Sequence, residues 1–387
     1  MKQTKQTKQT KQTKQTKKIK MTKPSIKLDM NSYSPSINKR LFVHSLKTLR
    51  ANSIKLCDNL LYLQINTKKC QPYNSSNIQK LLLDNVRSSK HLDISRFIPP
   101  IQLLSNCWFN TMFVTFFFSD KGRKFFRFFR ELMITGKKLD NSPIPTTIAK
   151  IFFILNLFIE ASYNQTTKSH DLFKTINQLT DKLNTNFFIY HLYKIITNSP
   201  TAIQPDSLFK NDNKVYDIPN INDAGNPLAY YETLLSYLKY NILKIMKQTF
   251  LKKENVFETI NKKFNLKTFT HIPDIIIIQD LQSSSTFETS YTFTDMKNIT
   301  YTYVLDSIIL TNKDHFDPEA NSHFVSVLTC NKEEYKFDGS SLSKLETFKW
   351  KKMINSNKNW RFKEDPNYEP EVYNFTKGYK IMFYYRS

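Results

Sequence analysis

The chain has 387 residues, of which 40% are hydrophobic and 14% aromatic, so it can bury a large core and global disorder is excluded. Only five glycines are present, and no glycine-rich phosphate-binding loop can be written from them. Lys and Arg number 57 against 33 Asp and Glu, giving a net charge of +24. This excess favours polyanions and allows weak contact with nucleic acid through basic segments.

The amino-terminal third is divided by composition. Residues 2–16 are five Lys-Gln-Thr repeats, which have no apolar face to bury, so residues 1–31 are predicted to be a disordered basic tail. Apolar residues at helical spacing in 41–49 and 81–86 predict a helical amino-terminal extension over 32–97. Pro99 and Pro100 end this extension because their rings block a helix.

The remainder is predicted to be a helical half, 98–265, followed by a β half, 266–387. Helices are expected at 106–118, 123–134, 146–162, 171–184, 188–197 and 227–250. Strands are expected at 274–279, 300–309, 324–330, 334–338 and 379–385. Helices followed by antiparallel strands indicate an α+β fold. The most apolar stretches, 107–118 and 148–161, are shorter than the roughly 20 residues of a spanning helix, so no membrane span is expected.

The four cysteines, Cys57, Cys70, Cys107 and Cys330, include no pair at zinc-site spacing, so no structural zinc site is expected. The thiol chemistry described below uses neither a metal nor a cofactor, so none is expected. Four cysteines in a chain of this length do not form a disulfide framework, and no secretory signal is recognisable. These features predict a reducing compartment, the cytoplasm, with the nucleus as the alternative.

Cys107 is the first candidate for chemistry. It follows Ser105 and Asn106, two residues favoured before a helix, and it opens an apolar helical run. A thiol in the first turn of a helix faces the positive end of the helix dipole, which favours the nucleophilic thiolate. A buried, inert cysteine is the alternative interpretation.

His323 and Asp338 lie on two predicted strands joined by a tight turn near 330–332. A turn centred between Cys330 and Asn331 places them directly opposite, with Cβ atoms roughly 4.5–5.5 Å apart. A two-residue turn of Asn331 and Lys332 makes them diagonal neighbours on the same face, and a three-residue loop places them on opposite faces. The spacing therefore permits a carboxylate that orients an imidazole, which activates a thiol. A hairpin with a surface histidine is the alternative.

Cys, His and Asp in this chain order, on a helix and then on strands, is the layout of papain-like thiol hydrolases. The sequence resembles the ubiquitin-specific protease family (ubiquitin carboxyl-terminal hydrolases) in four short motifs over about 98–387. They are Gln102-Leu-Leu-Ser-Asn-Cys107-Trp-Phe-Asn, Pro273-Asp-Ile-Ile-Ile-Ile, Ser322-His323-Phe-Val-Ser-Val with Tyr335-Lys-Phe-Asp338, and Gly378-Tyr-Lys-Ile-Met-Phe-Tyr-Tyr-Arg386. A fainter similarity to ovarian-tumour-type deubiquitinases rests on 106–109 alone.

The resemblance implies a papain-like fold in which Cys107 is the nucleophile, His323 the general base, Asp338 the orienting acid and Gln102 the oxyanion donor. The implied activity is hydrolysis of peptide or isopeptide bonds after ubiquitin or a ubiquitin-like tail. This sequence departs from the family in lacking a glycine before the Cys turn, in carrying Gly339 where a second Asp is usual, and in lacking a Cys-rich zinc module.

Three alternatives remain open: a catalytically degenerate fold serving as a binding or virion-structural module, a protease for a viral precursor protein, and a basic nucleic-acid-binding protein. The composition fits an AT-rich genome, such as that of a large DNA virus or an AT-rich protist. His315 is a rival base, interpreted as part of a polar loop, and Cys330 is interpreted as structural. Residues 121–130 are interpreted as an amphipathic helix with phenylalanines in the core and cations in solvent.

Overall fold

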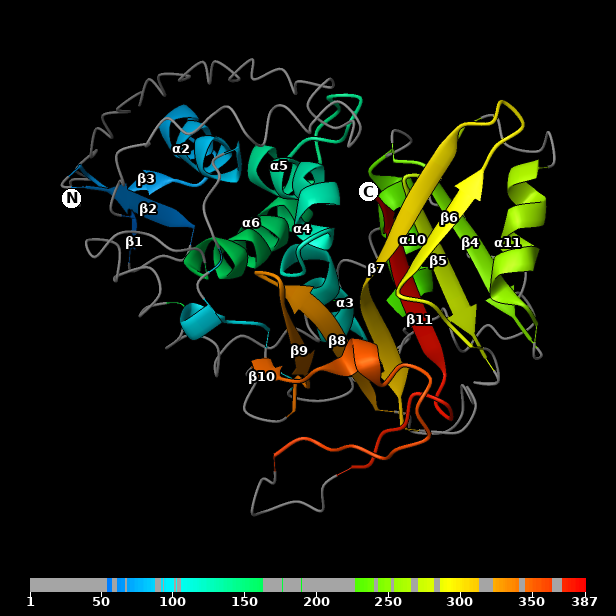
Figure 1. The fold of residues 1–387 in the computed structure, drawn as a ribbon. Helices are drawn as coiled ribbons and strands as arrows, with labels where there is room; N and C mark the ends of the chain where they lie inside the picture. The colour runs from blue at the N-terminus through cyan, green and yellow to red at the C-terminus, as the bar shows by residue number, and fades with distance from the viewer. Residues whose placement is uncertain are drawn as a thin grey trace, which may run out of the picture.

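The computed structural model shows a mixed α+β protein (Figure 1). The residues that the structure describes are 54–57, 61–66, 68–87, 92, 94–100, 102, 106–162, 176, 189, 227–239, 243–251, 254–265, 271–281, 286–312, 323–340, 345–363 and 371–387.

An eight-stranded sheet forms the β half, in the order β10-β9-β8-β7-β11-β5-β4, with β6 paired to β7 beside this path. Its strands are β4 (Ile245–Phe250), β5 (Ile275–Asp280), β6 (Ser290–Thr294), β7 (Thr300–Thr311), β8 (Phe324–Cys330), β9 (Glu333–Phe337), β10 (Leu345–Thr347) and β11 (Lys380–Arg386). The strand pairs are antiparallel except β4 with β5, which is parallel. β11 lies between β7 and β5, at the centre of the sheet.

Both faces of the sheet are buried, which explains the continuous apolar runs of its central strands. In β11, Ile381, Phe383 and Tyr385 belong to one core, whereas Met382 and Tyr384 belong to the other. All six residues of β5 are buried for the same reason.

The core on the first face includes residues of five helices: α3 (Cys107–Phe117), α4 (Gly122–Phe125), α5 (Arg127–Thr135), α6 (Thr146–Ala161) and α10 (Pro227–Tyr237). Of these, α3 contacts β7 and β8. The second face carries α11 (Val256–Asn265) and the 3₁₀ turn η6 (Trp350–Lys352). Another such turn, η2, spans Ile94–Arg96. Figure 1 shows α3 beside β8, and the two elements are in direct contact. None of the described helices is both long enough and apolar enough to cross a membrane.

A small lobe precedes the helices, with β1 (Ile54–Leu56), β2 (Tyr62–Ile65), β3 (Gln71–Pro72) and α2 (Ser76–Arg87). It packs on α5 and α6 through an apolar cluster that includes Leu82, Phe153 and Leu157. α2 contains the predicted helical run at 81–86, but the strands correct the expectation of an entirely helical extension. The run at 41–49 lies outside the described residues.

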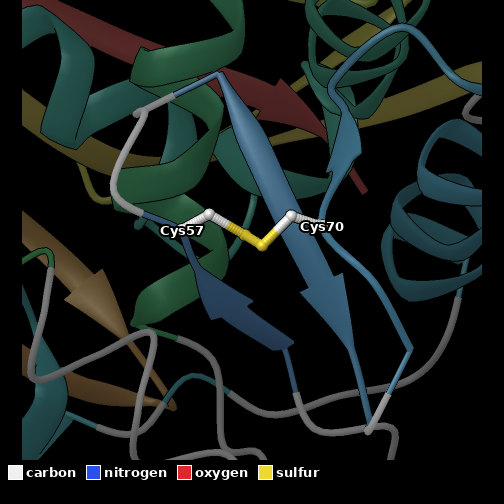
Figure 2. Close-up of a disulfide and its surroundings, with 2 residues drawn as sticks. All are labelled: Cys57 and Cys70. Carbon is white, nitrogen blue, oxygen red and sulfur yellow. A yellow bond between two sulfur atoms is a disulfide. The ribbon is translucent and has the colours of Figure 1, made fainter.

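A disulfide joins Cys57, after β1, to Cys70, before β3 (Figure 2). The sequence analysis did not predict this pairing. Disulfides persist mainly in oxidising compartments, so the disulfide does not support the predicted reducing compartment. The cytoplasmic location stays a prediction.

The five expected strands are present, and β6 and β10 are additional. The helix expected over 227–250 ends at Tyr237, and 245–250 is strand β4 instead. Here the apolar pattern was wrongly assigned, because pairing with β5 is a non-local contact that overrides helical spacing. The helix expected over 123–134 is interrupted at Phe126, between α4 and α5. Those expected at 171–184 and 188–197 lie outside the described residues, apart from Ile176 and Ile189.

Candidate active site

Helix α3 places Cys107 at its first position, as predicted. Asn106 is the preceding residue, and its carbonyl accepts hydrogen bonds from the backbone N–H groups of Phe109 and Asn110. Its side chain makes no capping hydrogen bond among the described residues, so the predicted side-chain cap is not formed by Asn106. The thiol of Cys107 nevertheless lies in the first turn, near the positive end of the helix dipole.

The face of α3 that carries Cys107 is adapted to lie against the sheet. Thr111, Thr115 and Ser119 follow Cys107 at four-residue spacing, so they share its face. Each hydroxyl donates to the carbonyl four residues earlier, at 2.9, 2.7 and 2.7 Å. These short side chains therefore satisfy their own polar groups, which lets α3 pack closely on β7 and β8.

The hairpin of β8 and β9 supplies His323 and Asp338, just outside its two open ends. Asn331 and Lys332 form a two-residue turn, since Cys330 pairs with Glu333 and Ser326 with Phe337. This register confirms the diagonal arrangement among the three turns considered. His323 Nε2 lies 2.7 Å from Asp338 Oδ1, and the side chains are 13% and 8% exposed.

The three side chains are coupled electrostatically. Burial alone would lower the pKa of His323, but hydrogen bonds with Asp338 and Cys107, and their negative charges, raise its pKa well above the usual value. Burial opposes ionisation of Asp338, yet the hydrogen bond and charge of His323 leave its pKa lowered overall. The surroundings of His323 therefore favour the protonated form of its ring. Since Nε2 faces Asp338, Nδ1 is the ring nitrogen available to the thiol.

Gln102 is also brought to this site. Its backbone N–H donates to the carbonyl of Gly339 at 3.3 Å. A Cβ added at Gly339 would lie 3.4 Å from Cβ of Gln102, so the two residues are in contact. The side-chain Oε1 of Gln102 is buried and has no hydrogen-bond partner among the described residues. Its role as an oxyanion donor stays a prediction.

Sequence reasoning missed Ser340 and Asn312. Ser340 donates to Asp338 Oδ1 from its backbone N–H at 2.9 Å and from its hydroxyl at 2.8 Å. Asn312 Oδ1 accepts a hydrogen bond from the backbone N–H of His323 at 3.2 Å. Ser340 could have been predicted from the two-residue turn. If the pairing of Cys330 with Glu333 is continued toward the open end of the hairpin, Ser340 lies opposite His323. No sequence signal identifies Asn312, which follows a different strand.

Asn110 is a third residue that sequence reasoning did not assign. It lies one helical turn after Cys107, is fully buried, and neither its Oδ1 nor its Nδ2 has a hydrogen-bond partner among the described residues. Its Nδ2 would lie 3.3 Å from a Cβ at Gly339. An unpaired buried amide costs free energy, and its presence beside Cys107 and Asp338 is typical of a functional site.

The other sequence candidates are placed elsewhere. His315 lies outside the described residues. Cys330 is fully buried at the end of β8, and burial raises its pKa to about 12, which disfavours a thiolate. Around 121–130 the phenylalanines are buried as predicted, but Arg130 is buried as well, against the expectation that the cations lie in solvent. It pairs with Glu160 at 2.9 Å. Within the described residues no cluster of His, Cys, Asp and Glu could hold a metal ion.

No family model matches the chain, and no curated protein matches it. Solved structures that match include the SAGA Ubp8/Sgf11/Sus1/Sgf73 DUB module, the same module bound to ubiquitin aldehyde, and a variant of it bound to monoubiquitin. The TM-scores are 0.38, 0.33 and 0.33, at 12%, 11% and 12% sequence identity. Each match covers 84% of this chain and 78%, 79% and 79% of the matched chain.

Proposed function

We propose that the protein is a papain-like cysteine peptidase of the ubiquitin-specific protease type. The observation that carries the proposal is the pair of His323 and Asp338, with Nε2 2.7 Å from Oδ1, near enough to Cys107 for the thiol to raise the pKa of His323. A nucleophile, a base and a group that orients the base are the three parts that thiol hydrolysis needs.

In this proposal His323 takes the thiol proton and Cys107 attacks the carbonyl carbon of the scissile bond. The imidazolium then protonates the leaving amine, and the acyl group stays on Cys107. His323 next removes a proton from water, which attacks the thioester and releases the acid. Asp338 keeps the ring oriented and stabilises its charged form throughout. Hydrolysis by these residues needs no cofactor.

The negative oxygen formed at the attacked carbonyl needs hydrogen-bond donors. The proposed donors are the side-chain amide of Gln102 and backbone N–H groups at the start of α3. Gln102 is supported by its contact with Gly339, next to Asp338. A preorganised donor of this kind is typically worth about 3–4 kcal/mol of barrier.

The proposed substrate is ubiquitin, or a ubiquitin-like protein, joined through its carboxy-terminal tail to another protein. Support comes from the four motifs that resemble the ubiquitin-specific proteases, together with the contacts of His323 with Asp338 and of Gln102 with Gly339. A precursor protein cleaved after a similar tail uses the same chemistry and is distinguished by the test. The cytoplasm, or the nucleus, is the proposed place of action.

The test is covalent labelling with ubiquitin that carries a thiol-reactive group at its carboxy terminus. An adduct is expected on the wild-type protein and on Cys330→Ala, the matched control for a second free thiol, but not on Cys107→Ala. Labelling of wild type by probes built on ubiquitin-like proteins, but not by the ubiquitin probe, would redirect the substrate and keep the peptidase. If Cys107 reacts with no tail probe and is no faster with a small alkylating agent than an ordinary thiol, the degenerate, non-enzymatic fold is correct.

A further inference from the structure

The short connection between α3 and α4, residues 118–121, is bonded to the β8–β9 hairpin by the carboxylate of Asp120. Asp120 Oδ1 accepts the backbone N–H of Asn331 at 2.9 Å, and Oδ2 accepts that of Lys332 at 2.8 Å. The backbone N–H of Asp120 also donates to the carbonyl of Thr329 at 2.8 Å. One residue at the end of α3 therefore holds both amides of the hairpin turn and the last part of β8.

The turn itself needs this support. Asn331 and Lys332 have φ angles of 50° and 66°, in the left-handed region that lysine rarely adopts. The Arg123 guanidinium donates to Asp120 Oδ1 at 2.7 Å and to Asn331 Oδ1 at 3.3 Å. Because a charged acceptor bonded to two amides fixes their direction, Asp120 determines where the turn sits on α3.

A second carboxylate, Asp306, holds the same connection from the sheet. Asp306 Oδ2 accepts the backbone N–H groups of Lys121 and Gly122, at 3.0 and 3.3 Å, and the residue is 3% exposed. The register of β7 against β11 shifts here, with Ser307 opposite Phe383 and Leu305 opposite Tyr384. Asp306 is thus the extra residue of a β-bulge, a feature that redirects a side chain.

The latch formed by Asp120 and Asp306 lies at the opposite end of α3 and of the hairpin from the candidate site. Cys107 opens α3, which is 11 residues or about 16 Å long, and the latch follows the other end of this helix. His323 and Asp338 flank the open end of the hairpin, and Asn331 and Lys332 close it. The two elements that carry the reacting groups are therefore fixed to each other at the far end.

We infer that Asp120, supported by Asp306, is a positioning residue that sets the orientation of His323 and Asp338 relative to Cys107. This inference rests on the proposed thiol chemistry but not on ubiquitin as the substrate. A shift of the hairpin along α3 would separate the imidazole from the thiol, and displacements of about 1 Å at a reacting group can cost about 100-fold in rate.

The test measures how fast Cys107 reacts with chloroacetamide between pH 5 and pH 9, by mass spectrometry of its peptide in the full-length folded protein. Asp120→Asn keeps the size of the side chain but turns an N–H₂ group toward one turn amide. It is expected to slow labelling at pH 7 about 10-fold and to move the pH profile toward that of an ordinary thiol, near about 8.5. Asp306→Asn, measured separately, is expected to slow labelling about threefold in the same direction.

Glu333→Gln is the matched control, because Glu333 is an exposed carboxylate beside the same turn that pairs with Lys349 and not with the α3–α4 connection. It is expected to leave the profile unchanged. The inference is overturned if Asp120→Asn lowers the melting temperature while its folded fraction keeps the wild-type pH profile. If Asp120→Asn does not fold, the profile of Asp306→Asn decides. If Cys107 of the wild-type protein is labelled no faster than an ordinary thiol, both the inference and the proposed function are overturned. If Cys107 is labelled fast but forms no adduct with the ubiquitin probe, only the proposal of ubiquitin as the substrate is overturned.

Discussion

Two buried ion pairs, one in the helical half and one at the candidate site, are alike in geometry but different in chemistry. Arg130 pairs with Glu160 at 2.9 Å in the helical half, with side chains 5% and 1% exposed. His323 pairs with Asp338 at 2.7 Å, with side chains 13% and 8% exposed. Distance and burial alone would assign both pairs the same role.

The difference lies in the cation and in what its other atoms contact. Arg130 is always protonated, and its Nε donates to Asn156 while Asn85 donates to the paired Glu160. This network joins α5, α6 and α2, so it stabilises the attachment of the amino-terminal lobe. His323 is a titratable group, and contacts with Asp338 and with the Cys107 thiol raise its pKa well above the usual value. A buried pair becomes a candidate for catalysis when its cation can exchange a proton with a nucleophile.

The largest effect is expected on the histidine pair. Asp338→Asn should lower the rate of Cys107 acylation about 10²- to 10⁴-fold, because the His323 ring loses the charge that holds its tautomer and raises its pKa.

The same pair makes stability depend on pH. The protonated His323 stabilises the folded state in full below about pH 6.5, and this contribution declines as the pH rises through the raised pKa of His323. In the variant this decline should shrink, as measured by thermal melts at pH 6 and pH 9. A variant that keeps the wild-type rate would show that the pair is structural.

Breaking the arginine pair should affect stability and not chemistry. Glu160→Ala leaves Arg130 buried without its counter-ion and is expected to cost about 3–5 kcal/mol in the free energy of unfolding, measured by urea denaturation. The labelling rate of Cys107 in the fraction that stays folded should be unchanged. A slower rate at full folding would mean that the two pairs are coupled.

A pH-dependent effect of intermediate size is expected at Asp306, whose pKa is raised to about 6 by burial, with the charge of Asp120 adding to the rise. The folded state then binds a proton more tightly than the unfolded state, so stability should fall as the pH rises from about 4 to about 6. The full difference is about 3 kcal/mol. Asp306→Asn should remove this slope from urea denaturation series at several pH values, and an unchanged slope would assign it to another carboxyl.

The smallest effect is expected at Ser340, whose hydroxyl is one of two Ser340 donors to Asp338 Oδ1. Ser340→Ala removes the hydroxyl and keeps the backbone N–H, so the acylation rate should fall about 3- to 10-fold. Ser340→Thr keeps a hydroxyl and should restore most of the rate. Equal rates in the two variants would show that the hydroxyl does not orient Asp338.

Local signals predicted much of the candidate site. A cysteine at the start of an apolar run predicted the beginning of α3. The hairpin spacing predicted that His323 and Asp338 share a face in two of three possible turns, and the structure has the two-residue turn. These features depend on neighbours within a few residues, which is why sequence reasoning reaches them. Asn312 and Asp120 could not be predicted in the same way, because each contacts the hairpin from another part of the chain.

The wrong predictions of secondary structure and burial have the same cause, which is contact between residues far apart in the sequence. Residues 245–250 form a strand only because β5 lies beside them, and the amino-terminal strands depend on each other and on packing against α5 and α6. Arg130 looks like a surface cation until Glu160, 30 residues away, provides its partner. Burial of a charge is decided by such partners and not by the local pattern.

The central place of β11 has a consequence for how the protein is made. Residues 380–386 pair with β7 on one side and β5 on the other, so the sheet lacks its middle until this segment has left the ribosome. Cys107 and His323 are both synthesised earlier, yet α3 has no complete sheet to dock on before β11 inserts. A chain that lacks residues 380–386 would therefore lack the strand that joins β7 to β5, and the reactivity proposed for Cys107 would depend on completion of this sheet.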